Sequence, residues 1–436
     1  MLTPDQAWDG AARVAGALAA RGAEPGDRVA FVATPAEDLV VAVLGASASG
    51  VVPVVLNPGL LPHERDVLVG DAEPVVVIGD GELPGLLAGA PIEVADVPLV
   101  RPMHYTSGTS GRAKGVYGGV LDHDAAWAAV LDEREVWDFG PDDAYLAAGP
   151  LYHSAPLRFA IGTLLAGGTV RVLPHWSVEG FLEGLAGGAT TTFIAPTPLQ
   201  RLLNAVVHDG IPFDTEGFRL LAHAGAPCPH PVKERAIELF PAGSVWEFYG
   251  STEGQFTACP AGEWQARPGT VGRARPHREI RVDADDIIWC RPPVHARFTY
   301  WRNETATAAA WSEDGEWFTV GDLGYLDDDG YLWIESRRED LIITGGVNVY
   351  PVEVEQALSR TPGVRELAVF GVPDAEWGQR VCVAAVGDIV PGDVHAFAAT
   401  SLARYKRPKS VYVVEELPTS ANGKILRRRL TEMYSR

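Results

Sequence analysis

The chain has 436 residues, of which 47% are hydrophobic and 21% are charged, and its formal net charge is −21 at pH 7. This length exceeds one ordinary hydrophobic core, and the balance of apolar and charged residues excludes an intrinsically disordered chain. The strong acidity excludes a general nucleic-acid-binding or anionic-membrane-binding surface, because both need a basic footprint.

Cysteine usage and the N-terminal residues favour a cytoplasmic protein. The four cysteines Cys228, Cys259, Cys290 and Cys382 show no CxxC pair or metal-ligand spacing, which predicts reduced, mostly buried thiols. The first residues lack the basic and apolar regions of a signal peptide. Residues 38–61 approach membrane-spanning length, but their glycines and prolines favour a core helix followed by a buried strand. We therefore expect no membrane span.

In chain order, the first predicted elements alternate between helix and strand. Helices are predicted over 5–22, over 36–48 and from Pro62, and strands over 28–33, 51–56 and 74–78. The alternation returns between about 140 and 250, with strands at 144–148, 169–173, 191–194 and 220–222 and helices near 157–166 and 177–186. Such alternation predicts mostly parallel sheets covered by helices, with ligands bound at the carboxyl ends of the strands.

The last third of the chain has a different pattern. Short strands with turn signals predict a small β-rich subdomain at about 265–335. Beyond it, helices are predicted at 351–360, at 393–404 and after Gly423, and strands near 364–371, 380–386 and 410–414. The predicted fold class is therefore α/β. A large N-terminal domain, residues 1–337, has two mostly parallel, helix-covered sheets and the β-rich subdomain, and an α+β domain, residues 340–436, follows it.

Residues 105–115 form the strongest local motif. The segment combines hydroxyl groups, three glycines and one lysine, and can surround phosphate oxygens with N–H, O–H and ammonium donors. The candidate ligands are Thr106, Ser107, Gly108, Thr109, Ser110, Gly111 and Lys114. It is not a Walker loop, since Ala113 precedes the lysine and Gly115 follows it. Taken alone, a loop of this composition is more often a surface turn.

Seven further motifs follow in order, and together they make the chain resemble the adenylate-forming superfamily of acyl-CoA synthetases, aryl-CoA ligases, luciferases and peptide-synthetase adenylation domains. The resemblance covers nearly the whole chain, and the likeness is greatest to fatty-acid and aryl-acid CoA ligases. The motifs are residues 150–153, 225–227, 249–253, 319–322, 337–342, 345–351 and 418–424.

The resemblance implies a role for each motif in nucleotide binding. Tyr249 stacks on adenine, Thr252 holds the α-phosphate, and Glu253 binds Mg²⁺. Asp322 accepts the ribose hydroxyls, and Arg337 lies near the ribose and phosphate. The remaining ATP/AMP-binding positions are Gly225, Ala226, Pro227, Gly250 and Ser251.

The resemblance also implies a mobile C-terminal domain. Lys424 reaches the substrate carboxylate and the α-phosphate, where a cation brings two anions together. Gly345 and Gly346 line the tunnel for the pantetheine arm of CoA. The domain turns about a hinge at 336–340 with Glu339 as pivot, where relatives usually have Asp or Lys.

The acyl pocket is expected among His153, Ser154, Ala224, Gly225 and Gly250, with His153 as a candidate catalytic residue that gates the acyl or thiol channel. A hydrogen-bonded core histidine is an equal alternative for His153. The segment holds no carboxylate for an ammonium group, which disfavours an α-amino acid. Its small residues suit an apolar fatty or aryl acid.

These expectations amount to an acid–thiol ligase that uses ATP, Mg²⁺ and coenzyme A and forms an acyl-AMP intermediate. Three alternatives stay open: transfer to an acyl-carrier protein, a non-catalytic nucleotide-binding homologue, and oxidative chemistry of the luciferase kind. Basic residues at 404–409 suit CoA phosphates or an acidic carrier equally. The sequence also permits a homo-oligomer.

Overall fold

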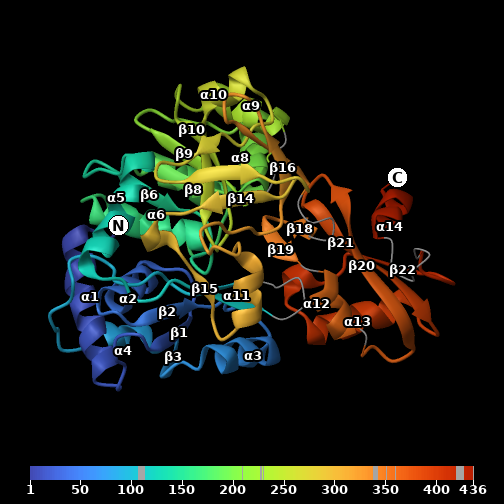
Figure 1. Ribbon diagram of the computed structural model, residues 1–436, viewed down its shortest axis with the longest axis horizontal. Coiled ribbons are helices and arrows are strands. Elements are labelled where there is room, and N and C mark those ends of the chain that lie inside the picture. Colours follow the sequence, from blue (N-terminus) through green and yellow to red (C-terminus); the bar gives the residue numbers. More distant parts are fainter. Residues whose placement is uncertain are drawn as a thin grey trace. The chain divides into compact units, whose positions relative to one another are not determined.

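The computed structural model describes residues 1–106, 113–208, 210–225, 228, 230–336, 342–349, 351–358, 360–418 and 427–435. The chain divides into two compact units (Figure 1). One contains Met1–Pro58, Val69–Tyr105 and Gly115–Glu335. The other contains Gly59–Leu68, Thr106–Lys114 and Ser336–Arg436.

The N-terminal sheet has three parallel strands, with β1 (Arg28–Val32) between β2 (Val52–Val55) and β3 (Val76–Gly79). Helix α1 (Pro4–Ala19) is capped by Thr3, whose hydroxyl accepts a hydrogen bond from the Gln6 amide, and it packs along α2 (Glu37–Ala48) (Figure 1). Ten residues of α2 are buried, so the long apolar stretch is a core helix followed by a buried strand, as predicted. Helices α3 (Pro62–Ala72) and α4 (Leu83–Leu87) flank β3 in the chain.

The second sheet has seven strands in the order β12-β11-β10-β9-β8-β6-β7. Strands β6 (Ala144–Ala147), β7 (Thr169–Val172), β8 (Thr191–Ile194), β9 (Leu220–His223) and β10 (Val245–Gly250) are parallel. Strands β11 (Gln255–Pro260) and β12 (Arg273–Ala274) add an antiparallel edge. The prediction of two mostly parallel sheets is therefore confirmed.

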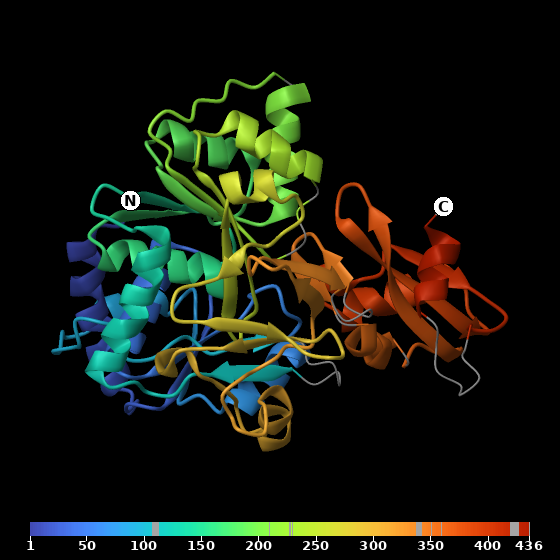
Figure 2. The same cartoon turned by 45° about the horizontal axis from the view of Figure 1, so that its top comes forward.

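Helices cover both faces of this sheet because adjacent residues of each strand point to opposite faces. Tyr145 and Phe193 pack with α6 (Ser154–Leu165) in one core. The neighbouring Leu146 and Ile194 pack in a second core with α7 (Val178–Ala186), α8 (Pro196–His208) and α9 (His230–Leu239), which gather together in Figure 2. Helices α5 (His123–Trp137) and α10 (Ala261–Ala266) complete this part.

Short antiparallel strands follow, as the turn signals predicted. The pairs are β13 (Glu279–Val282) with β14 (Ile288–Arg291), and β16 (Leu323–Leu326) with β17 (Leu332–Ser336). Strand β15 (Thr299–Tyr300) instead joins β5 (Lys114–Tyr117) and β4 (His104–Thr106) in a three-stranded sheet. A 3₁₀ turn (Val294–Ala296) and α11 (Glu304–Ala310) lie on either side of β15 in the chain.

The C-terminal part is an α+β unit with a five-stranded sheet. Strands β19 (Val347–Val349), β18 (Ile342–Thr344), β21 (Gly378–Gly387) and β20 (Val364–Asp374) are adjacent in that order, and β22 (Ser410–Val413) also pairs with β21. Helices α12 (Pro351–Leu358) and α13 (Pro391–Ser401) pack in one core, and α14 (Arg427–Tyr434) packs in another. A 3₁₀ turn covers Arg404–Lys406.

Two further findings concern thiols and membranes. All four cysteines are free, and three of them are buried. Within the described ranges, no helix is both long enough and apolar enough to cross a membrane.

Candidate functional site

The Tyr249–Glu253 motif lies where β10 ends and the chain turns into β11. The antiparallel register of these strands shifts between Tyr249 and Gly250, which marks a bulge. A side chain at Gly250 would lie 2.8 Å from the Gly254 carbonyl oxygen, so the tight return requires glycine there. The Ser251 amide donates to the Gly254 carbonyl (2.8 Å), and the Ser251 hydroxyl accepts from the Glu253 amide (3.2 Å). The turn thus fixes the backbone on both sides of Thr252, which is partly exposed.

Tyr249 and Asp322, predicted to bind adenine and ribose, are brought together. The Tyr249 hydroxyl donates to Asp322 Oδ2 at 2.7 Å, and both residues are buried. The Tyr249 ring packs 4.7 Å from the Phe256 ring, centroid to centroid, which holds it against the sheet. Asp322 directly precedes β16 and follows Gly321, whose φ is +77°. This pair can present an aromatic ring and a carboxylate to one nucleoside.

Glu253 is held by a residue that sequence reasoning missed. Its Oε1 accepts a hydrogen bond of 2.8 Å from the hydroxyl of Tyr300, on β15, and Glu253 is 6% exposed. A carboxylate oriented in this way fits Mg²⁺, which is bound by one or two carboxylates together with phosphate oxygens and water. No local pattern around Tyr300 signals this contact, since it joins residues 47 positions apart.

His153 lies at the N-terminal end of α6 as its N-cap residue, and Ser154 is the first residue of that helix. Its ring centroid is 4.8 Å from that of Tyr152, whose carbonyl oxygen is 3.1 Å from Nδ1 of His104. Burial lowers the pKa of His153 to about 4 and, with the charge of His153, lowers the pKa of His104 to about 4. Both imidazoles are therefore neutral at pH 7. His104 is a second histidine that sequence reasoning missed.

The remaining predicted acyl-pocket residues follow β9. Ala224 is buried in the same core as α6, whereas Gly225 is exposed and has a φ of +91°. A side chain built at Gly225 would meet nothing within 4 Å, so the backbone conformation, not crowding, accounts for the glycine. Ala224 and α6 thus belong to one packed layer.

Thr106 and Lys114 end β4 and begin β5, on either side of the predicted phosphate loop. The Thr106 hydroxyl lies 3.5 Å from the Lys114 carbonyl oxygen, and both residues are partly buried. The residues on both sides of the predicted loop are thus strand ends.

Gly345 and Gly346 form the two-residue turn of the β18–β19 hairpin, in which Thr344 pairs with Val347. Their φ values are +59° and +78°, which a type I′ turn requires. A side chain at Gly345 would also lie 3.1 Å from the Trp377 ring. The turn itself therefore explains both glycines, and their role in a CoA tunnel stays a prediction.

Several predicted site residues lie outside the described residues. They are Ser107, Gly108, Thr109, Ser110, Gly111, Ala226, Pro227, Arg337, Glu339 and Lys424.

The predicted basic patch at 404–409 needs correction. Lys406 is 7% exposed, and its ammonium group pairs with Glu353. Arg407 donates to the carbonyl oxygens of Leu402 and Ala399, at 2.9 and 2.8 Å. Lys406 and Arg407 therefore stabilise the C-terminal unit, whereas Arg404 and Lys409 are exposed, so only part of the predicted patch faces solvent. Sequence spacing could not show this, because Glu353 is 53 positions away from Lys406.

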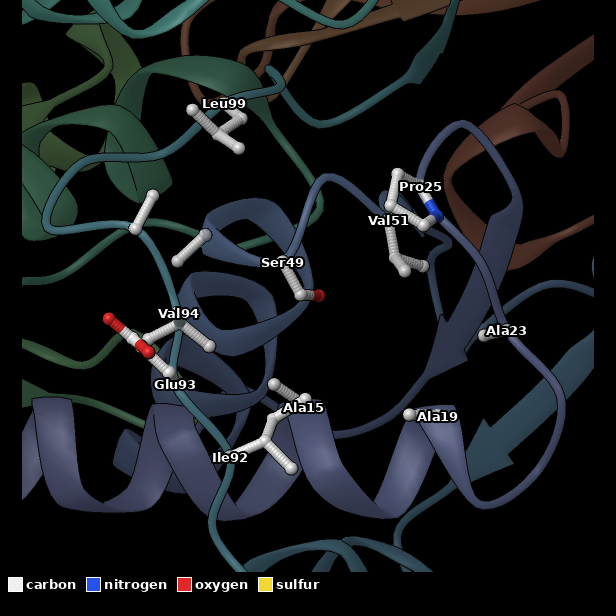
Figure 3. A pocket seen from close by; sticks show the side chains of 12 residues that line it. Ala15, Ala19, Ala23, Pro25, Ser49, Val51, Ile92, Glu93, Val94 and Leu99 are labelled. Atoms are coloured by element: carbon white, nitrogen blue, oxygen red, sulfur yellow. The ribbon is translucent and has the colours of Figure 1, made fainter.

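A pocket of about 510 Å³ lies between α1, the end of α2 and residues 92–99 (Figure 3). Its lining is mostly small and apolar, with Ala15, Ala19, Ser49 and Val94 among its residues. None of the predicted site residues lines it.

Comparison with known proteins identifies the family. The model of the AMP-binding enzyme family matches residues 1–100 and 100–287, and that of the AMP-binding enzyme C-terminal domain matches residues 353–424.

Individual relatives cover almost the whole chain. A 2-succinylbenzoate–CoA ligase of Bacillus cereus is 29% identical over 94% of this chain and 89% of its own length. The long-chain-fatty-acid–CoA ligase FadD13 of Mycobacterium tuberculosis is 31% identical over 97% of this chain and 91% of its own.

Among solved structures, o-succinylbenzoate CoA synthetase (MenE) from Bacillus subtilis, bound to a product analogue, superposes with a TM-score of 0.88 at 28% identity. The match covers 98% of this chain and 93% of that one. Another structure of that synthetase contains the acyl-adenylate intermediate OSB-AMP. It superposes with a TM-score of 0.68 at 27% identity, covering 98% of this chain and 92% of that one.

Proposed function

This chain belongs to the family of AMP-binding enzymes, and from that premise we propose that it is an ATP-dependent carboxylate–CoA ligase. The carboxylate of an organic acid attacks the α-phosphate of ATP, which gives an acyl-adenylate and releases pyrophosphate. The thiol of CoA then attacks the acyl carbon, which gives a thioester and releases AMP. The acid is a fatty or aryl acid, in keeping with relatives that are CoA ligases of 2-succinylbenzoate and of long-chain fatty acids.

The observation that carries this proposal is the hydrogen bond between Tyr249 and Asp322. Two motifs to which the resemblance assigns the two ends of one nucleoside meet at 2.7 Å, although 73 positions separate them. The Ser251–Gly254 turn, which positions the hydroxyl-bearing Thr252 beside Glu253, supports an adjacent phosphate site. If Tyr249 and Asp322 had unrelated structural roles, nothing would require their side chains to meet.

The site assignments belong to the same proposal. Glu253 holds Mg²⁺, which supplies charge neutralisation for the phosphates when bound. Lys114 and the 106–111 loop hold phosphate oxygens, Arg337 lies near the ribose, and the acyl group occupies the space beside His153 and Ala224. The acceptor is CoA, with a carrier protein as the alternative, and the location is cytoplasmic.

We also propose that residues 340–436 turn about Glu339 between the two half-reactions. Expelling pyrophosphate and admitting a thiol cannot use the same wall of the pocket, so one arrangement of the walls cannot serve both steps. Lys424 serves adenylation, and the Gly345–Gly346 turn serves thioester formation.

The test is an acid-dependent AMP-release assay across fatty, aryl and dicarboxylic acids, with and without CoA. We expect Lys424→Ala to lower acyl-adenylate formation about 100-fold or more, because it removes the cation between two reacting anions. Thioester formation from supplied acyl-AMP should change little.

The matched control is Arg429→Ala, which removes an exposed positive charge from α14. Equal loss of both half-reactions in Lys424→Ala would contradict the division of labour. ATP binding without AMP release for any acid would favour a non-catalytic nucleotide-binding homologue.

A further inference from the structure

Arg158 lies on α6, one helical turn beyond Ser154 of the predicted acyl pocket. Residues four positions apart share one face of a helix, so both side chains belong to the same side of α6. The guanidinium carbon of Arg158 is 5.5 Å from the centroid of the Phe248 ring and 5.8 Å from that of the Phe159 ring. Phe248 directly precedes Tyr249 and shares a core with Ala224. The guanidinium group of Arg158 therefore packs on the same core that contains Ala224 of the predicted acyl pocket.

The hydrogen-bonding capacity of Arg158 is largely unused. Its Nε and Nη2 atoms are buried and make no hydrogen bond within the described part of the chain. The nearest carboxylate oxygen, Glu133 Oε2, lies 3.2 Å from Nε without hydrogen-bond geometry.

Glu133 is already engaged by other donors. Its Oε1 accepts from Arg275 Nη2 at 3.1 Å, and its Oε2 accepts from the indole N–H of Trp137 at 3.0 Å. The Glu133 carboxylate is therefore shared by the guanidinium groups of Arg158 and Arg275. Arg275 makes a hydrogen bond with it, whereas Arg158 makes an ion pair without hydrogen-bond geometry.

The other carboxylate of this network is also occupied. Asp132 accepts two hydrogen bonds of 2.7 Å from Arg278, and His295 Nε2 lies 3.3 Å from its Oδ2. Among the described residues joined by these contacts, three arginines face two carboxylates: Arg158, Arg275 and Arg278 against Asp132 and Glu133. The network therefore carries one positive charge that it does not balance.

This charge persists at neutral pH. Burial lowers the pKa of Arg158 to about 10, which leaves the guanidinium protonated. The nearby imidazoles of His104 and His153 are neutral, so they add hydrogen-bonding atoms but no charge. A partly buried cation whose buried donors are unused is costly unless an anion pairs with it, and a planar guanidinium matches the geometry of a carboxylate.

We propose that Arg158 is a substrate-specificity residue that binds a second carboxylate on the acid, so that the enzyme activates a fatty or aryl dicarboxylic acid. One carboxylate of the substrate is adenylated, and the other pairs with Arg158 Nη2 and Nε. This inference rests on the proposed ligase function. The sequence predicts a fatty or aryl acid with an apolar body, and the inference adds a second carboxylate at the far end of that acid.

The experiment compares matched acids. The aliphatic pairs are succinate with butyrate, glutarate with valerate, adipate with hexanoate and pimelate with heptanoate, and the aryl pair is phthalate with benzoate. The readout is kcat/KM for AMP release, measured for the wild-type enzyme, Arg158→Met and Arg158→Lys. Arg134→Met is the matched control, because Arg134 is an exposed arginine on α5 next to Glu133.

We expect the wild-type enzyme to prefer the dicarboxylate in at least one pair. Arg158→Met should lower kcat/KM for that dicarboxylate about 100-fold, as expected for truncating one partner of a buried charge pair, and leave its monocarboxylate partner unchanged or improved. Arg158→Lys should retain part of the preference, because it keeps the charge but not the planar fork. Arg134→Met should behave as wild type.

A wild-type enzyme that uses every monocarboxylate as well as its partner overturns the inference while leaving the ligase function intact, and this result needs no variant to fold. A preference for the dicarboxylate that survives in Arg158→Met also overturns it. Thermal stabilisation of the wild type by a dicarboxylate, absent in Arg158→Met, supports the site independently of turnover. If no acid supports turnover or stabilises the enzyme, both the inference and the ligase function are overturned.

Discussion

At the residue scale, the contact between Tyr249 and Asp322 links two motifs into one proposed nucleoside site. The hydroxyl of Tyr249 fixes one oxygen of the carboxylate, and Phe256 fixes the tyrosine ring. Both groups are thus oriented before any ligand binds, which reduces the entropy lost on binding. Tyr300 acts on Glu253 in the same way.

Tyr249→Phe should weaken ATP binding without abolishing it. The substitution keeps the ring for stacking but removes the hydrogen bond to Asp322, a contact of about 1 kcal/mol. We expect KM for ATP to rise about five- to tenfold, with kcat within about twofold, in the AMP-release assay. Tyr325→Phe is the control, because Tyr325 is exposed and stacks on Trp333. An unchanged KM in Tyr249→Phe would show that the hydrogen bond does not orient the site.

At the scale of single elements, the start of α6 and the start of β4 hold two histidines in a neutral state. His104 on β4 is 6% exposed and contacts the Tyr152 carbonyl oxygen, and His153 caps α6. Burial is the largest cause of both lowered pKa values, and the charge of Arg158 lowers the pKa of His104 further. These elements therefore oppose protonation of the histidines.

This burial predicts a loss of stability in mild acid. The pKa of His104 is about 4 in the folded chain and 6.5 in its ordinary state. Between these values the unfolded chain binds a proton that the folded chain does not, so the free energy of unfolding falls as the pH drops from about 6.5 to about 4 and levels off below. Urea unfolding at several pH values measures this slope. His104→Gln should make it shallower, whereas an unchanged slope would assign the effect to other groups; the exposed His123→Gln is the control.

At the scale of the whole molecule, the proposed catalytic cycle depends on residues 336–340. The proposed pivot Glu339 lies between β17 and β18 in the chain. A pivot must change its backbone dihedral angles, and proline removes that freedom by fixing φ.

Glu339→Pro should therefore affect the two half-reactions unequally. We expect acyl-adenylate formation to stay within about threefold of wild type if proline locks the adenylating arrangement, and thioester formation from supplied acyl-AMP to fall at least about tenfold. Glu339→Ala, which keeps backbone freedom, should preserve both. If the Pro and Ala variants form the thioester at equal rates, Glu339 is not the pivot.

Local sequence patterns predicted about half of the helices and strands by position, because hydrophobic periodicity and glycine or proline boundaries are local properties. Strand β8, Thr191–Ile194, lies where it was predicted, and α2 and β2 differ from the prediction by one or two residues. Helix α5 was not predicted: its buried residues are only Ala126, Asp132 and Trp137, which is too few for a clear apolar stripe. Strands β4 and β5 are too short to stand out beside a glycine-rich loop.

The sequence by itself determined the fold class, the order of the motifs and the family, because each of these is written in short segments of the chain. Tertiary structure decided which side chains meet: Tyr300 with Glu253, Lys406 with Glu353, and Arg158 with an already shared Glu133. These contacts span 25 to 53 positions or cross between sheets and helices, so no local spacing encodes them. Hydrogen bonding and charge balance in a buried layer depend on the whole packed arrangement, and only that arrangement shows which donors remain unused.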